Sequence, residues 1–174
     1  MSRRRRGGGD AERRENFFLT PLGIVFTTVV IDLVGFGIVV PILPLWAEDL
    51  GASPTVIGIL SAVYSAMQFI FAPFLGRLSD RYGRRPVIIL ALIGSAVSSL
   101  LIGIADSLVL LFVARILNGI SGASYSTAQA YVADITTKEE RAKGMGLIGA
   151  AFGIGFIIGP GIGGLCALVD RRLP

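Results

Sequence analysis

The sequence GRLSDRYGRRP, residues 76–86, separates two long apolar stretches of the chain. It contains four arginines and one aspartate, and Pro86 closes it. Charged residues make up only 16% of the whole chain, against about 25% in a typical soluble domain. Charge gathered so tightly between apolar stretches predicts a short polar connection between two segments that lie in an apolar environment.

Five apolar segments are long enough to cross a lipid bilayer. They are residues 16–47, 50–76, 86–105, 107–133 and 144–169. Three contain no charged residue, while the first contains only Asp32 and the fourth only Arg115. A helix of about 20 apolar residues crosses a bilayer, and the mean hydropathy of the chain is +0.73. We therefore predict an all-α integral membrane protein with five transmembrane helices, at about 17–46, 54–75, 86–105, 107–132 and 138–169.

The distribution of Lys and Arg predicts the orientation. The N-terminal tail carries six of them, residues 76–86 four and residues 134–143 three, whereas the connections at 48–54 and around Asp106 carry none. Cytoplasmic loops are enriched in Lys and Arg. We expect a multi-pass protein of the cell membrane with a cytoplasmic N-terminus, and a disordered Arg-rich tail at 1–15. This topology explains the net charge of +4, so no nucleic-acid partner is expected.

Few residues are available for metal binding or nucleophilic catalysis. The chain has no histidine and one cysteine, Cys166, in an apolar segment. A metal cluster or a Ser-His or Cys-His hydrolase site is therefore not expected. We predict that the chain is not an enzyme and needs no cofactor.

Asp32 and Arg115 are the two charged residues inside apolar segments. A charge at the centre of a bilayer costs about 2.5–3.5 kcal/mol on insertion scales, so both should face the protein interior or a wet cavity. They could form a structural ion pair between the first and fourth helices. We favour a role in coupling a proton or a substrate, because a buried carboxylate beside an arginine can link protonation to binding.

Two further sets of residues lie at membrane depth. The polar and aromatic side chains that could line a cavity for an amphipathic molecule, or could instead pack between helices, are Phe36, Tyr64, Gln68, Asn118, Tyr125 and Gln129. The last helix contains a set of small residues around a proline, namely Gly155, Gly159, Pro160, Gly163 and Gly164. Such residues allow close helix approach and a kink.

The segment at 76–86 closely resembles the signature of the major facilitator superfamily, G-x-L-[AS]-D-R-x-G-R-[RK]-[PR]. The matching positions are Gly76, Leu78, Ser79, Asp80, Arg81, Gly83, Arg84, Arg85 and Pro86. Three other segments resemble patterns of its drug:proton antiporter branch, which includes tetracycline and multidrug efflux proteins. They are DLVGFGIVVPILP at 32–44, RILNGISGA at 115–123 and GFIIGPGIGG at 155–164.

The resemblance implies roles for these residues. Asp80 would face the N-terminus of a neighbouring helix, and the arginines would pair with acids of the next cytoplasmic loop; together they would hold a gate shut. Those arginines are Arg81, Arg84 and Arg85, and the available acids are Asp134, Glu139 and Glu140. Gly76 and Gly83 would permit a tight turn. Asp32 and Arg115 would take part in proton coupling, with the proton gradient as energy source, and the glycines of the last helix would seal and flex the interface between halves.

The resemblance also implies an architecture. Residues 16–174 would form an incomplete N-terminal half, equivalent to helices 1–5 of a six-helix half, and a C-terminal half would be its expected partner. The implied function is proton-coupled efflux of small amphipathic molecules by alternating access, seen here as an N-terminal fragment. Two alternatives stay open: a truncated non-transporting remnant or membrane interaction module, and an importer of sugars or organic acids with the same fold.

Overall fold

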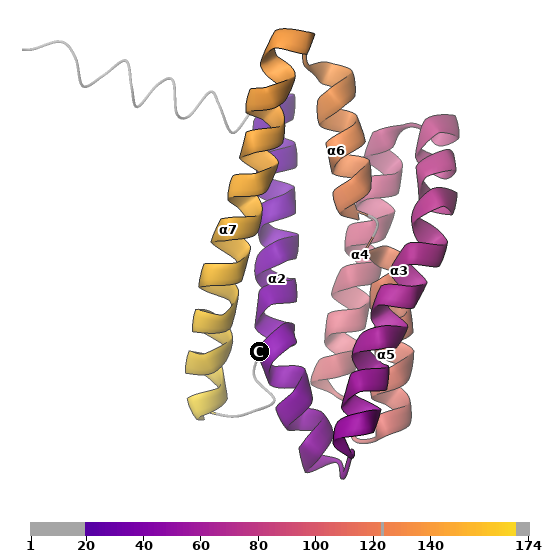
Figure 1. Ribbon diagram of the computed structural model, residues 1–174, viewed down its shortest axis with the longest axis vertical. Helices are drawn as coiled ribbons and strands as arrows, with labels where there is room; N and C mark the ends of the chain where they lie inside the picture. Colours follow the sequence, from indigo (N-terminus) through magenta and orange to yellow (C-terminus); the bar gives the residue numbers. More distant parts are fainter. Residues whose placement is uncertain (1–19, 123, 170–174) are drawn as a thin grey trace, which may run out of the picture.

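Helices make up almost all of the chain that the structure describes. The computed structural model describes residues 20–122 and 124–169. Its helices (Figure 1) are α2 (Pro21–Asp49), α3 (Pro54–Tyr82), α4 (Arg84–Gly103), α5 (Leu108–Ser121), α6 (Ser124–Ile135) and α7 (Lys138–Val169). Since α5 and α6 belong to one apolar span, these ranges hold five helices long and apolar enough to cross a membrane. The predicted all-α fold with five transmembrane helices is confirmed.

Hydroxyl side chains cap the starts of three helices. Thr20 accepts a hydrogen bond from the backbone N–H of Gly23, and Pro21 follows it as the first helical residue. Ser53 and Pro54 do the same for α3. At α7, the Thr137 hydroxyl accepts from the N–H of Glu140 and donates to its carboxylate. These caps satisfy N–H groups that have no partner within the helix.

Residues 76–86 are helical over most of their length. The predicted helix ends near residue 75, but α3 continues to Tyr82 and α4 begins at Arg84. Gly83 alone breaks the helix, with φ of +98°, a conformation that residues with a Cβ rarely adopt. Gly76 lies inside α3, so its predicted role in a tight turn is wrong. This polar segment extends α3 by about two turns beyond the predicted end, because its side chains form hydrogen bonds and an ion pair with one another.

The other helix ends differ from the prediction by a few residues. Helix α2 continues to Asp49 and α6 to Ile135, while α4 ends at Gly103. Helix α7 covers the predicted range, and its backbone is continuous through Pro160. The predicted disordered tail at 1–15 lies outside the described residues.

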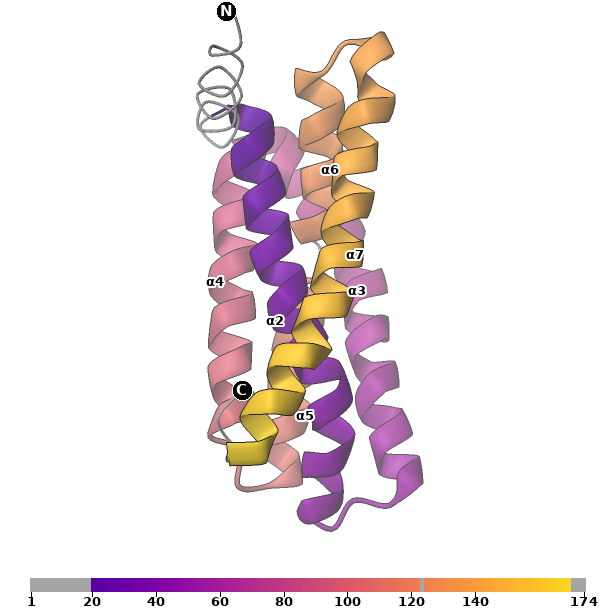
Figure 2. The same cartoon turned by 90° about the vertical axis from the view of Figure 1, so that its left-hand side faces the viewer.

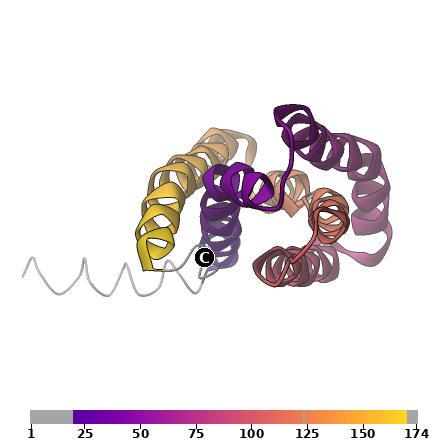
Figure 3. The same ribbon diagram turned by 90° about the horizontal axis from the view of Figure 1, so that it is seen from below.

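The helices form two groups that run along one long axis. Helix α7 packs along α2, and α5 packs against both α3 and α4. Seen from below, α2 and α7 lie together on one side, and α3, α4 and α5 on the other (Figure 3). Helix α6 contacts members of both groups and lies near one end of the bundle, beside α7 and α2 (Figures 1 and 2). The α5–α6 span therefore links the two groups.

Two apolar clusters lie toward the two ends of α2. One consists of Ile42, Leu43, Trp46, Ala47, Leu60, Ile102, Ala105, Leu111 and Ala114. The other consists of Val25, Val29, Leu33, Ala128, Val132, Ile148 and Ala151. Large apolar side chains also cover the outside; Phe69 is 83% exposed and Ile157 is 78% exposed. An outer surface this apolar suits lipid.

Candidate functional site

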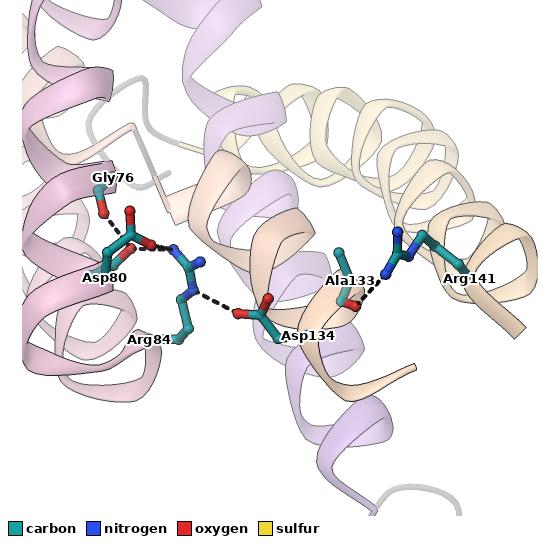
Figure 4. A network of polar contacts seen from close by, with 7 residues as sticks. Gly76, Asp80, Arg84, Ala133, Asp134 and Arg141 are labelled. Carbon is teal, nitrogen blue, oxygen red and sulfur yellow. Dashed lines mark hydrogen bonds and ion pairs between the residues drawn. The ribbon is translucent and has the colours of Figure 1, made fainter. Parts of the chain in front are cut away.

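Arg84 joins three polar side chains at the break between α3 and α4. Its Nη1 lies 2.7 Å from Oδ1 of Asp80, and its Nε lies 2.9 Å from Oδ2 of Asp134 on α6. Nη1 also donates to Oγ of Ser79 at 2.7 Å, and that buried hydroxyl donates to the carbonyl of Gly76. Figure 4 shows Arg84 between the two carboxylates. One arginine therefore ties the end of α3 and the start of α4 to the end of α6.

A second arginine holds the same end of α6. Nη2 of Arg141 on α7 donates to the carbonyl of Ala133 at 3.0 Å (Figure 4). The last carbonyls of a helix lack partners within it, and a nearby cation stabilises them. Together with Arg84, this contact connects the α6–α7 turn to both groups of helices.

The other predicted pairs of this network are not found. Both ion pairs between described side chains involve Arg84. Arg81 lies over the ring of Tyr82, with Cζ 5.6 Å from its centroid, and Arg85 is exposed. Glu140 takes part in the cap of α7, and Glu139 is exposed. Of the three acids expected to pair with the arginines, Asp134 alone does so here, because it ends α6 directly opposite Arg84.

Asp32 lies near the middle of α2, where α4 approaches it. Its Oδ1 accepts a hydrogen bond of 2.8 Å from Oγ of Ser95 on α4. Ser95 was missed by the sequence analysis. A serine among Ala, Val and Leu in an apolar segment was the available signal, but it did not indicate which neighbour the hydroxyl would face.

Arg115 is buried on α5, with a relative exposure of 4%. Its guanidinium Cζ lies 5.4 Å from the ring centroid of Tyr64 on α3, and its Nε has no hydrogen-bond partner in the described part of the protein. Tyr64 is close enough to interact electrostatically with Asp32 as well as with Arg115. Tyr64 therefore lies near both charges, and an ion pair between Asp32 and Arg115 stays a prediction.

Two amides connect helices at the same depth. Nδ2 of Asn118 donates to Oγ of Ser98 on α4 at 2.9 Å, with both groups buried. Nε2 of Gln68 on α3 donates to the carbonyl of Gly122, the C-cap of α5, at 2.9 Å. Asn118 and Gln68 thus make hydrogen bonds between helices, and their cavity-lining role stays a prediction. These hydrogen bonds occupy part of the hydrogen-bonding capacity of each amide, which has two donors and an acceptor.

A row of aromatic rings crosses four helices. Phe36 on α2 lies 5.4 Å from Tyr64 and 6.0 Å from Phe156 on α7. Phe156 stacks on Phe152 at 6.0 Å, and Phe152 meets Tyr125 of α6 edge to face at 4.5 Å. Gln129 donates to the hydroxyl of Tyr125. Phe152 and Phe156 were not among the predicted site residues, although their spacing of four residues places them on one helix face.

The glycines of α7 divide into two groups. A Cβ on Gly155, Gly159 or Gly163 would lie 2.6–2.9 Å from atoms of α2, which include backbone atoms for the first two. Those positions are four residues apart and form one face. A Cβ on Gly164 would meet nothing within 4 Å. The close approach to α2 therefore depends on three glycines, and Gly164 takes no part in it.

Comparison with known proteins decides the family. The family model described as the Major Facilitator Superfamily matches residues 25–170. The chain belongs to the Major Facilitator Superfamily. Its helices α2, α3, α4, α5–α6 and α7 are thus the five membrane-spanning helices of a multi-pass transporter-family protein.

Several members of the superfamily are similar to the chain along most of its length. It is 40% identical over 158 residues to the tetracycline resistance protein, class B, of Escherichia coli, covering 89% of this chain and 39% of the relative. The class C protein of Escherichia coli is 42% identical over 154 residues, covering 87% and 39%. Multidrug resistance protein 1 of Bacillus subtilis is 41% identical over 162 residues, covering 92% and 41%. The chain spans about two fifths of the length of these curated relatives.

Proposed function

We propose that the chain is the N-terminal part of a proton-coupled efflux transporter that exports small amphipathic molecules by alternating access. Its relatives are named as tetracycline and multidrug resistance proteins. The row of aromatic rings from Tyr64 to Tyr125 offers apolar faces for a planar ligand, and it lies beside the buried guanidinium of Arg115. In this proposal the remainder of the cavity belongs to a C-terminal half.

Arg115 is the observation that carries the proposal. Its guanidinium is buried in a transmembrane helix, and its Nε has no hydrogen-bond partner among the described residues. Burying a charge in this way has a large desolvation cost. In the coupling role that we assign to Asp32, protonation of its carboxylate changes the net charge near Tyr64 and Arg115. A cationic or polar substrate and a proton would then compete for the same group of residues.

The network of Arg84 forms the cytoplasmic gate in this proposal. Asp80 approaches Arg84 from α3, which belongs to one helix group, and Asp134 approaches it from α6, which contacts both groups. If the helix groups move during transport, these contacts must break and form again. The glycine face of α7 keeps α2 and α7 moving as one unit.

The experiment uses a chimera in which residues 20–169 replace the matching segment of the class B tetracycline resistance protein. We expect it to confer tetracycline resistance and to support transport driven by a pH gradient in inverted vesicles. Asp32→Asn should abolish this transport with membrane expression intact. Asp106→Asn, which changes an exposed carboxylate outside the helices, should not. Resistance absent from an assembled chimera would overturn the efflux proposal, and unchanged transport in Asp32→Asn would remove Asp32 from coupling.

The proposed location is the cell membrane, with the Arg84 network on the cytoplasmic side. Cys166 is the only cysteine, so a Cys166→Ser background allows single cysteines to be placed. In intact cells a membrane-impermeant maleimide should label Ser107→Cys and leave Lys138→Cys unlabelled until the membrane is opened. The reverse pattern would invert the orientation.

A further inference from the structure

We propose that Ser95 of α4 is a positioning residue for Asp32, anchored through Ser98 and Asn118 to the helix that carries Arg115. The inference rests on the proposed coupling role of Asp32. It assigns a part to the apolar portion of α4, where no site residue was predicted.

Three short hydrogen bonds connect α2, α4 and α5 through Ser95 and Ser98. Ser95 Oγ donates to Oδ1 of Asp32 at 2.8 Å, Ser98 Oγ donates to the backbone carbonyl of Ser95 at 2.8 Å, and Asn118 Nδ2 donates to Ser98 Oγ at 2.9 Å. Ser98 is fully buried and Asn118 is 7% exposed. Buried hydrogen bonds of this kind are expensive to leave unmade, so they fix the backbone of α4 at Ser95 relative to α5.

The position of α4 relative to α5 is also constrained. A Cβ on Gly94, the residue before Ser95, would collide with the side chain of Ser121 on α5. Asn118 and Arg115 lie three residues apart and so share a face of α5. These hydrogen bonds therefore link the Asp32 carboxylate to the helix of Arg115 by way of α4.

Titratable and charged groups on the neighbouring helices also belong to the surroundings of Asp32. Tyr64 of α3 and Arg115 of α5 interact electrostatically with each other, and Tyr64 also with Asp32. On α6 the hydroxyl of Tyr125 accepts from Gln129, and α7 has no charged residue between 144 and 169. The Ser95 hydroxyl is the donor from α4. A hydroxyl that donates to one carboxylate oxygen restricts the orientation of that group, so Ser95 holds the Asp32 carboxylate in place.

The test follows the carboxyl resonance of Asp32 at one fixed pH in the chain itself, embedded in lipid nanodiscs, by NMR of ¹³C-carboxyl-labelled aspartate. Loss of a signal in Asp32→Asn assigns the resonance. We expect Ser95→Ala to move this resonance, because the carboxylate loses its hydroxyl donor, and Ser95→Thr, which keeps the hydroxyl, to restore it. Asn118→Ala should move the resonance in the same direction, because it removes the bond that joins α4 to α5 beside Ser95.

Ser99→Ala is the matched control. Ser99 lies on the same helix and takes part in none of the three hydrogen bonds, so its removal should leave the Asp32 resonance unchanged. An unmoved resonance in Ser95→Ala, or an equal change in Ser99→Ala, would overturn the positioning role, and an unmoved resonance in Asn118→Ala would overturn the link to α5. Because this readout needs no transport, its failure is distinguishable from failure of the chimera.

Discussion

Gly159 of α7 lies against Gly37 of α2 so closely that neither position has room for a side chain. A Cβ on Gly159 would lie 2.7 Å from backbone atoms of Gly37, and a Cβ on Gly37 would lie 2.6 Å from the carbonyl oxygen of Gly155. In a bilayer, apolar burial does not drive helices together, so they associate through close van der Waals packing of small residues. The α2–α7 pair is held by this backbone-to-backbone contact.

Gly159→Ala should therefore destabilise the helix pair. Its methyl group would meet backbone, which cannot rotate away, and overpacking of this kind costs about 1–3 kcal/mol. The measurement is the free energy of unfolding in mixed micelles titrated with SDS. Gly161→Ala is the control, because a Cβ there meets nothing within 4 Å; it should be neutral or slightly stabilising. Equal effects of the two substitutions would contradict this packing.

Arg84 and Arg85 are adjacent arginines with different surroundings. Arg84→Ala removes two ion pairs and the hydrogen bond to buried Ser79, and should lower the free energy of unfolding by about 1–2 kcal/mol, partly screened by salt. Arg85→Ala should change it by less than about 0.5 kcal/mol. The same unfolding assay at low and high ionic strength measures both. A larger loss for Arg85→Ala would show that the network is arranged differently.

Asn118 and Ser98 form a buried hydrogen bond that a double-mutant cycle can isolate. Asn118→Ala, Ser98→Ala and the double variant should give a coupling free energy of about 0.6–1.7 kcal/mol, the range for side-chain hydrogen bonds between membrane helices. Ser99→Ala replaces Ser98→Ala in the control cycle, where the coupling should be close to zero. Additive effects of Asn118→Ala and Ser98→Ala would mean that the bond contributes nothing.

Phe36 contacts both Tyr64 and Phe156, so it is central to the aromatic row. In the chimera, Phe36→Ala should weaken binding of tetracycline by about tenfold, since a buried aromatic contact contributes about 0.5–1.5 kcal/mol beyond its area. Quenching of intrinsic fluorescence by the ligand gives the dissociation constant. Phe69→Ala removes a ring that is 83% exposed on the outer surface of α3 and should leave binding unchanged. Weaker binding only in Phe69→Ala would place the ligand elsewhere.

Long-range composition was a good guide to the helices, and local motifs were a poorer guide to their ends. The apolar runs predicted five spans because a helix in lipid must be apolar over its full length. The end of α3 was predicted too early because Gly76 and the charges after it suggested a loop. In the structure Arg84 donates a hydrogen bond to Ser79 and forms an ion pair with Asp80. The polar side chains thus have partners within the segment, and α3 continues to Tyr82.

The candidate site also contains residues that could be recognised from the sequence and others that could not. Asp32 and Arg115 could be singled out from sequence, because a charge in an apolar run is costly wherever its partners lie. The side chains that contact Asp32 and Arg115 could not be identified in this way. Ser95 is 63 residues from Asp32, and Tyr64 lies on a different helix from Arg115. Such pairs depend on which faces of the helices meet.

Hydropathy, charge spacing and the motif at 76–86 were enough to establish an all-α membrane protein, its five spans and the family that it resembles. These properties are local or additive along the chain, so they can be read without knowing the packing. The packing was needed to show that Gly155, Gly159 and Gly163 meet α2, that Asp134 pairs with Arg84, and that Ser95 reaches Asp32. Each depends on the rotation and register of one helix against another, which are set by many small contacts at once.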